Sequence, residues 1–205
     1  MKLEHSCRKI AEAGHRGDAQ LVRGALGSAD QAARTAALGA ALRLGILDYK
    51  MLTKALGDRS GRVRRRALEL APRLPASEIA GSRRVELAEQ AAGLLGDKEC
   101  AEIAAFAVGE LGVTAPAIVA ALAAQASDHP DPLCRESAVA ALGALGTGLD
   151  AVLAATGDIA VVRRRAVIAL AAFDGPAVTP ALKRALNDRD WQVRQAAEDL
   201  VDPDP

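Results

Sequence analysis

Apolar residues recur along this chain at the spacing of amphipathic helices. If each residue advances about 100° around a helix axis, four residues of one segment fall on a single stripe: Val63, Ala67, Leu70 and Leu74. A later segment repeats this stripe with Val162, Ala166, Ala169 and Phe173. No alternation of apolar and polar residues of useful length competes with this pattern. The sequence therefore predicts an all-α protein.

The segments that carry these stripes are copies of one motif. An aspartate, a short gap, Val-Arg and an alanine three residues later begin at Asp58, Asp158 and Asp188. Two copies are looser, and one degenerate copy has glutamate in place of arginine. The equivalent positions, about 30 residues apart, are Arg34, Arg64, Glu102, Arg135, Arg163 and Arg194. A period of this length predicts a stack of helical repeats.

A further helical segment precedes each copy of the motif. These segments cover residues 19–26, 49–56, 85–95, 116–126, 149–155 and 180–186. Each unit is therefore a pair of helices joined by a turn. Aspartates mark the turns and are expected to cap the second helices: Asp58, Asp97, Asp128, Asp158 and Asp188. Thr179 and Pro180 are the expected N-cap and first position of the last 180–186 segment.

Paired helices with this motif resemble HEAT-like repeats, and most closely the short HEAT-like repeats named after phycobilin lyase subunits. The resemblance covers residues 18–201. It implies a right-handed α-solenoid of about six helix pairs. We expect one repeat domain over 1–205, with a capping helix at 1–17. The repeats are expected at 18–45, 46–81, 82–113, 114–146, 147–175 and 176–202.

The arginines of the motif are expected to be structural. They lie about 100° from the buried stripe, beside the neighbouring repeat, in the same row on every second helix. Turn aspartates recur nearby, and a guanidinium group can bridge a carboxylate and loop carbonyl groups. The sequence therefore predicts an arginine–aspartate ladder between repeats. Its arginines are Arg34, Arg64, Arg135, Arg163 and Arg194.

The next row of side chains, about 200° from the stripe, is expected to face outward. Its members are Thr35, Arg65, Ile103, Glu136, Arg164 and Gln195. Because charges in this row are mixed, it does not form a continuous basic track. Five arginines that the ladder does not use are the candidate partner-binding residues: Arg62, Arg65, Arg66, Arg164 and Arg165.

Composition narrows the range of functions. The 205 residues include 26 basic and 26 acidic side chains, and 2% of the chain is aromatic. Zero net charge argues against a protein that coats nucleic acid or membrane, and scarce aromatic residues argue against an aromatic-lined pocket. Residues 54–84 differ locally, with nine basic and three acidic side chains. This stretch is a candidate docking site for an acidic partner or a phosphate backbone.

The sequence contains no evident catalytic or metal-binding pattern. Its three cysteines are far apart and have no zinc-binding spacing. HEAT-like deoxyhypusine hydroxylases hold two irons with His-Glu pairs, whereas no histidine here precedes a glutamate. HEAT-like alkylpurine DNA glycosylases use tryptophan-rich clefts, whereas this chain has one tryptophan, Trp191, which we expect to pack against its neighbours. We expect no catalytic residue, no metal and no cofactor.

The resulting hypothesis is a cytoplasmic, non-enzymatic scaffold that binds a protein partner, an acidic one in the simplest case, on the face lined by the second helices. The cytoplasmic location is expected because the cysteines suggest no disulfide framework and no apolar stretch is long enough for a secretion signal or a membrane span. One alternative is nucleic-acid binding through residues 54–84, with a second contact at 163–165. Another, from the resemblance to phycobilin lyase subunits, is an accessory subunit of a lyase-type enzyme.

Overall fold

A computed structural model describes residues 2–201 and the side chains from Cys7 onward. All regular secondary structure in these residues is helical. The part between residues 2 and 201 contains thirteen α-helices, two short 3₁₀ helices (Ala71–Arg73 and Leu170–Ala172) and no strand. The α-helices are α1 (Lys2–Arg16), α2 (Ala19–Leu26), α3 (Gln31–Arg43), α4 (Tyr49–Leu56), α5 (Gly61–Leu70), α6 (Ser82–Ala92), α7 (Ala101–Leu111), α8 (Pro116–Asp128), α9 (Pro132–Leu145), α10 (Leu149–Ala155), α11 (Ala160–Ala169), α12 (Val178–Ala185) and α13 (Trp191–Glu198).

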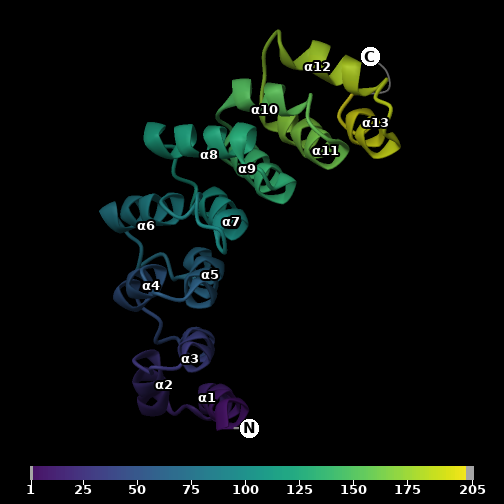
Figure 1. Cartoon of the computed structure of the whole chain (residues 1–205). Helices are drawn as coiled ribbons and strands as arrows, with labels where there is room; N and C mark the ends of the chain where they lie inside the picture. The colour runs from purple at the N-terminus through teal and green to yellow at the C-terminus, as the bar shows by residue number, and fades with distance from the viewer. Residues whose placement is uncertain (1, 202–205) are drawn as a thin grey trace.

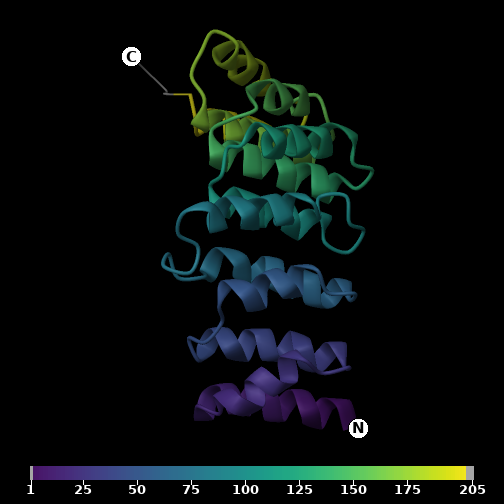
Figure 2. The same cartoon turned by 90° about the vertical axis from the view of Figure 1, so that its left-hand side faces the viewer.

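The α-helices form two rows that run the length of the molecule (Figure 1). The first-helix row contains α2, α4, α6, α8, α10 and α12. The second-helix row contains α3, α5, α7, α9, α11 and α13, and the N-terminal helix α1 joins this row by packing against α3. The rows bend together, and the second-helix row lies on the inner side of the bend (Figure 1). Viewed from the side, successive pairs are stacked as layers (Figure 2).

Small residues set the close spacing within the second-helix row. A Cβ atom added at Gly143 of α9 would lie 2.7 Å from the Cβ of Ala169 in α11. One added at Gly109 of α7 would lie 3.1 Å from the Cα of Ala141 in α9. Glycine costs helix stability, so its presence here is explained by the close approach of two backbones. Alanine likewise fills the buried stripe without separating the helices.

The bounds of three first helices differ from the predicted ones, and α8 ends at Asp128, two residues later than predicted. Helix α6 begins earlier than predicted, at Ser82, and ends at Ala92. Helix α12 begins at Val178, so the prediction that Thr179 caps it and Pro180 opens it is wrong. Val178 is buried, which favours extending the helix back to include it. Pro180 is still in the first turn, where a missing N–H breaks no intrahelical hydrogen bond.

Candidate interaction surface

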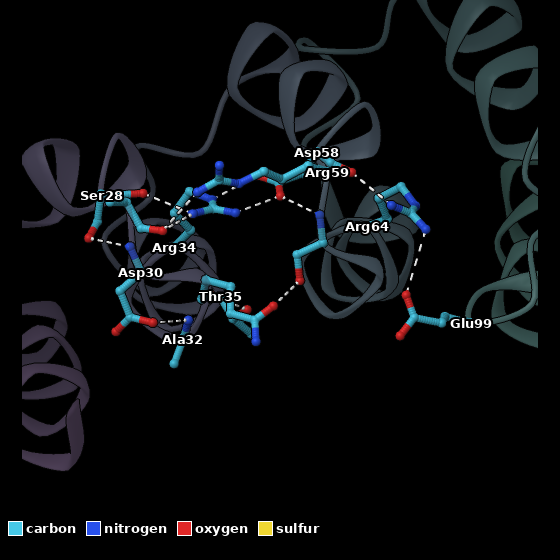
Figure 3. A network of polar contacts seen from close by, with 12 residues as sticks. Ser28, Asp30, Ala32, Arg34, Thr35, Asp58, Arg59, Arg64 and Glu99 are labelled. Atoms are coloured by element: carbon cyan, nitrogen blue, oxygen red, sulfur yellow. Dashed lines mark hydrogen bonds and ion pairs between the residues drawn. The ribbon is translucent and has the colours of Figure 1, made fainter. Parts of the chain in front are cut away.

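Arg34 of α3 joins two successive turns of the stack. Its Nε and Nη2 atoms donate to the two carboxylate oxygens of Asp58, each at 2.7 Å. Its Nη1 atom donates to the carbonyl oxygens of Ser28 and Ala29 at 2.9 and 3.0 Å (Figure 3). Ser28 and Ala29 lie in the turn before α3, whereas Asp58 lies in the turn before α5. Arg34 is 8% exposed, and its guanidinium group therefore ties these two turns together and forms a rung between helix pairs.

Two further rungs have the same bidentate geometry, in which one arginine contacts both oxygens of a carboxylate. Arg135 of α9 donates to both carboxylate oxygens of Asp158, at 2.7 and 2.8 Å. Arg163 of α11 donates to both carboxylate oxygens of Asp188, at 2.8 and 2.6 Å. Each arginine also donates through Nη1 to a carbonyl oxygen of its own preceding turn, at 2.8 Å to His129 and at 2.9 Å to Asp158. The pattern is thus set by the repeat rather than by one local contact.

Of the remaining motif arginines, Arg64 forms a less complete rung and Arg194 contacts only its own turn. Arg64 of α5 donates through Nη2 to one carboxylate oxygen of Asp97 at 2.6 Å and through Nη1 to the carbonyl of Asp58 at 2.8 Å. Its buried Nε has no hydrogen-bond partner among the described residues. Arg194 of α13, on the last helix described, donates through Nη1 to the carbonyl of Asp188 at 2.8 Å. The sequence-predicted ladder arginines therefore all contact their own turns.

The turn aspartates do not cap the second helices, and this prediction is wrong for all five of them. The N-caps of α5, α7, α9, α11 and α13 are Ser60, Cys100, Asp131, Ile159 and Asp190. Asp58 lies earlier in its turn, where its Oδ1 accepts from the backbone N–H of Ser60 at 2.8 Å. Three of the five, Asp58, Asp158 and Asp188, direct both carboxylate oxygens to an arginine of the preceding pair, which explains why they lie outside the cap position.

The rung arginines lower the pKa of the aspartates they contact. At Asp58 the largest cause is the hydrogen bonding from Arg34, which lowers the carboxyl pKa against the opposing effect of burial. Arg135 and Arg163 lower the pKa of their own partner aspartates in the same way. These carboxylates therefore stay ionised to a lower pH in the folded chain than in the unfolded chain.

The ladder is interrupted at α7. Glu102 occupies the arginine position of the motif there, so no arginine from α7 reaches the turn before α9. Gln125 of α8 is buried in this region, 6% exposed, and its Nε2 donates to the carbonyl of Ala101 at 3.0 Å. A neutral hydrogen bond and close helix packing therefore join α7 to the following pair in place of an ion pair.

Glutamates on neighbouring second helices engage two of the candidate partner-binding arginines. Arg65 of α5 donates to Glu102 of α7 at 2.9 Å. Arg165 of α11 contacts Glu136 of α9 at 3.1 Å. These four side chains are partly exposed, so the pairs contribute little to stability. They do reduce the positive charge that Arg65 and Arg165 offer to a partner.

The other three candidate arginines have different surroundings. Arg66 donates to Glu69 at 2.7 Å, and its guanidinium lies over Gly39 of α3. Arg62 and Arg164 are exposed, and no described carboxylate lies within ion-pair distance of either. Of the five candidates, only Arg62 and Arg164 are therefore exposed and outside the described ion pairs. Arg62 lies on α5, and Arg164 lies three second helices further along the row, on α11.

An apolar groove runs along the second-helix row from α7 to α13. It consists of three adjoining depressions of about 390, 320 and 290 Å³. Arg165 borders the first two and Ile168 borders the last two, so the depressions are continuous. Phe106, 47% exposed, lies at the α7 end, and Trp191, 64% exposed, lies at the α13 end. Alanines form much of the floor, including Ala140, Ala144 and Ala171.

Sequence reasoning missed this groove. The expectation that Trp191 packs is wrong, because its side chain projects from the first turn of α13 and remains largely exposed beside Arg164. Phe106 lies three residues after Ile103, and Ile168 lies four residues after Arg164, so both belong to the outward side of their helices. Extending the outward row by one helical turn could have revealed them.

The described part of the chain shows neither a metal-binding cluster nor a membrane-spanning helix. Among the described side chains, no group of three or more His, Cys, Asp and Glu is placed to hold a metal ion. Between residues 2 and 201, every helix is too short or too polar to cross a bilayer.

Comparisons with known proteins agree with the helical repeat. A profile of the PBS lyase HEAT-like repeat matches residues 162–188, which contain most of α11 and all of α12. A search of curated proteins found no match. The solved structure of YibA from Escherichia coli is similar at 14% identity and a TM-score of 0.66, over 96% of this chain and 73% of that one. The crystal structure of an engineered protein is similar at 18% identity and a TM-score of 0.63, over 88% of this chain and 94% of that one. At these identities the two structures support the fold alone. The match over residues 162–188 supports a HEAT-like repeat protein.

Proposed function

We propose that this chain is a non-enzymatic scaffold, a right-handed solenoid of about six helix pairs, that binds a partner protein along its second-helix row. The occupant proposed for the apolar groove is an amphipathic helix of the partner. One observation carries this proposal: Phe106, Ile168 and Trp191 are exposed along a single continuous groove. Exposed apolar side chains gathered in one depression, rather than scattered, are typical of protein-binding sites.

The dimensions of the groove suit a helix. It crosses four helices that pack about 8–10 Å apart, so its length is about 25–30 Å. At about 1.5 Å per residue, this length accommodates a helix of roughly 17–20 residues. The alanine floor permits close approach of a partner backbone, and the large side chains at either end can act as anchors.

Charges at the two ends of the groove favour one direction of the bound helix over the reverse direction. Glu110 is exposed at the α7 end, whereas Arg164 is exposed at the α13 end. Asp199 also borders the α13 end, where its Oδ1 accepts a hydrogen bond from Gln195 at 2.9 Å, so the charge at that end is mixed. We therefore expect a basic end of the partner helix over Glu110 and an acidic side chain of the partner beside Arg164.

Site-specific photo-crosslinking in the native cell tests this proposal. A benzoylphenylalanine residue is placed at position 106 or 168 in the groove, or at position 21, which is 40% exposed on α2 in the other row. We expect one protein adduct from the two groove positions and none from position 21. After the adduct is identified and the partner purified, Trp191→Ala should weaken its binding at least about tenfold, as expected for a large aromatic anchor.

Leu133→Ala provides the matched control. Leu133 is an apolar side chain of α9, 53% exposed, that does not line the groove, so its replacement should leave binding within about twofold. Equal adducts from position 21 and the groove would contradict the proposal. An adduct that nuclease digests would instead support nucleic-acid binding.

Reversing the charges of Arg65 and Arg66 is a less suitable test. Glu102 and Glu69 already contact these arginines, so glutamates at 65 and 66 would face like charges and lower stability as well as binding. Arg62→Gln and Arg164→Gln are cleaner, because both side chains are exposed and outside the described ion pairs. Of these two variants, only Arg164→Gln is expected to weaken binding of the protein partner.

A further inference from the structure

A pocket of about 750 Å³ opens between the turns of the first two helix pairs, far from the apolar groove. Its walls come from α2, α3, α4 and α5 and from the two turns that precede α3 and α5. We infer that this pocket binds a small organic anion, one with an apolar body and a phosphate or carboxylate group. The proposed protein-binding surface does not include it.

The interior of the pocket is apolar. The side chains that form its floor are Leu26, Leu38, Met51, Ala55 and Val63. Leu38, Ala55 and Val63 are buried and belong to the core between the two pairs. A volume of this size lies within the usual range of ligand pockets, about 300–1,000 Å³, and an apolar floor favours a hydrocarbon or aromatic body.

The rim of the pocket is cationic. Arg23 at the end of α2, Lys54 on α4 and Arg59 in the turn before α5 are all exposed and line the opening. No described carboxylate lies within ion-pair distance of these three side chains. Asp58 is the one acidic residue of the lining, and both of its oxygens are engaged by Arg34. The rim therefore presents three uncompensated positive charges to an incoming anion.

The contacts of Figure 3 hold the two turns in place around the opening. Arg34 connects the carbonyl groups of Ser28 and Ala29 to the carboxylate of Asp58. Arg59 spans the same gap and donates to the carbonyl of Ala29 at 3.2 Å. Because these walls are already ordered, a ligand would not have to order them on binding. The combination of fixed walls, an apolar floor and a cationic rim points to a ligand with both an apolar body and an anionic group.

Titration with alkyl phosphates tests the inference. The full chain is titrated with ethyl, butyl and octyl phosphate below their micelle-forming concentrations, at low salt, and followed by amide NMR. We expect saturable shifts at Ser28, Ala29 and Gly57 around the opening. Affinity should increase with alkyl length if the floor is used, since each buried methylene contributes up to about a fourfold gain.

Variants of the rim identify the site of binding. Arg23→Gln combined with Lys54→Gln should weaken octyl phosphate about fivefold, because each exposed pair contributes modestly. The matched control is Lys50→Gln, an exposed lysine of the same helix that does not line the pocket, which should change affinity by less than about twofold. Unchanged unfolding curves for the variants exclude a loss of fold as the cause.

Three results would overturn the inference. The first is the absence of saturable binding, and the second is binding that neither alkyl length nor the rim variants affect. The third is sedimentation with phosphatidate-containing vesicles without binding to the dissolved esters, which would assign the cations to a membrane surface instead. Trp191→Ala should not alter alkyl phosphate binding, so failure of the groove proposal and failure of this one are distinguishable.

Discussion

Replacing Asp188 with alanine is expected to leave Arg163 as a buried charge without its partner. The two side chains are 15% and 7% exposed, and two hydrogen bonds of 2.6 and 2.8 Å join them. Asp188 also accepts from the backbone N–H of Asp190 at 2.8 Å. Removing one partner of a fully buried ion pair costs about 3–5 kcal/mol. Because Arg163 keeps its bond to the carbonyl of Asp158 and some solvent reaches the site, we expect a loss of about 2–3 kcal/mol.

Urea unfolding followed by circular dichroism measures this loss. With a slope of about 2 kcal/mol/M, the midpoint should fall by about 1–1.5 M. Hydrogen exchange should show where stability is lost: protection should decrease mostly in α12 and α13, because each pair of a repeat stack contacts only its neighbours. Asp174→Ala is the control, since Asp174 is exposed in the connection before α12 and should change stability by less than about 0.5 kcal/mol.

Two outcomes would refute this reasoning. A loss below about 1 kcal/mol for Asp188→Ala would mean that the buried rung contributes no more than a surface pair. Equal loss of protection in α2 and α3 would mean that the rung does not act locally. The double variant Arg163→Met with Asp188→Leu should recover most of the stability that Asp188→Ala loses, because an apolar pair leaves no buried charge.

Three further predictions concern pH, packing and thiol chemistry. Asp58, Asp158 and Asp188, which each accept two hydrogen bonds from an arginine, have a lowered pKa in the folded chain. Their contribution to stability is therefore complete above about pH 5 and decreases as the pH falls below about 4. Urea midpoints measured at decreasing pH should show this decrease. Gly143→Ala should lower the unfolding free energy by about 1–2 kcal/mol in thermal melts, because the new methyl group meets Ala169 and overpacking outweighs the gain in helix propensity. Burial raises the pKa of the Cys100 thiol to about 11, so Cys100 should react with a disulfide reagent only after unfolding, whereas the half-buried Cys7 should react in the folded chain.

Sequence periodicity can predict where a rung is possible, because a rung depends on local geometry. The position of Arg163 relative to the buried stripe follows from the helical repeat angle, and the distance from Asp158 to Asp188 follows from the repeat length. The two requirements place a guanidinium group beside the next turn. The role of each aspartate is less predictable, because a carboxylate before a helix can serve either as a cap or as a partner for arginine.

The outward surface is harder to predict because it depends on how neighbouring helices are aligned. Arg65 meets Glu102 only because α5 and α7 pack in a particular register, which a single-helix projection does not contain. The exposure of Trp191 also depends on its neighbours, since α11 passes beside the first turn of α13 without covering it. Charge counts over residues 54–84 therefore overstate the charge available to a partner.

The interruption of the ladder at α7 makes the middle of the molecule respond differently to its surroundings. Rungs lie on both sides, from Arg34 and Arg64 before it and from Arg135 and Arg163 after it, and acid weakens every one of them. The neutral bond from Gln125 and the close packing beside Gly109 do not titrate. In acid the stack should therefore come apart from its two ends and keep its central pairs together, which makes the junction of α7 with α8 and α9 the natural core of a minimal folded fragment.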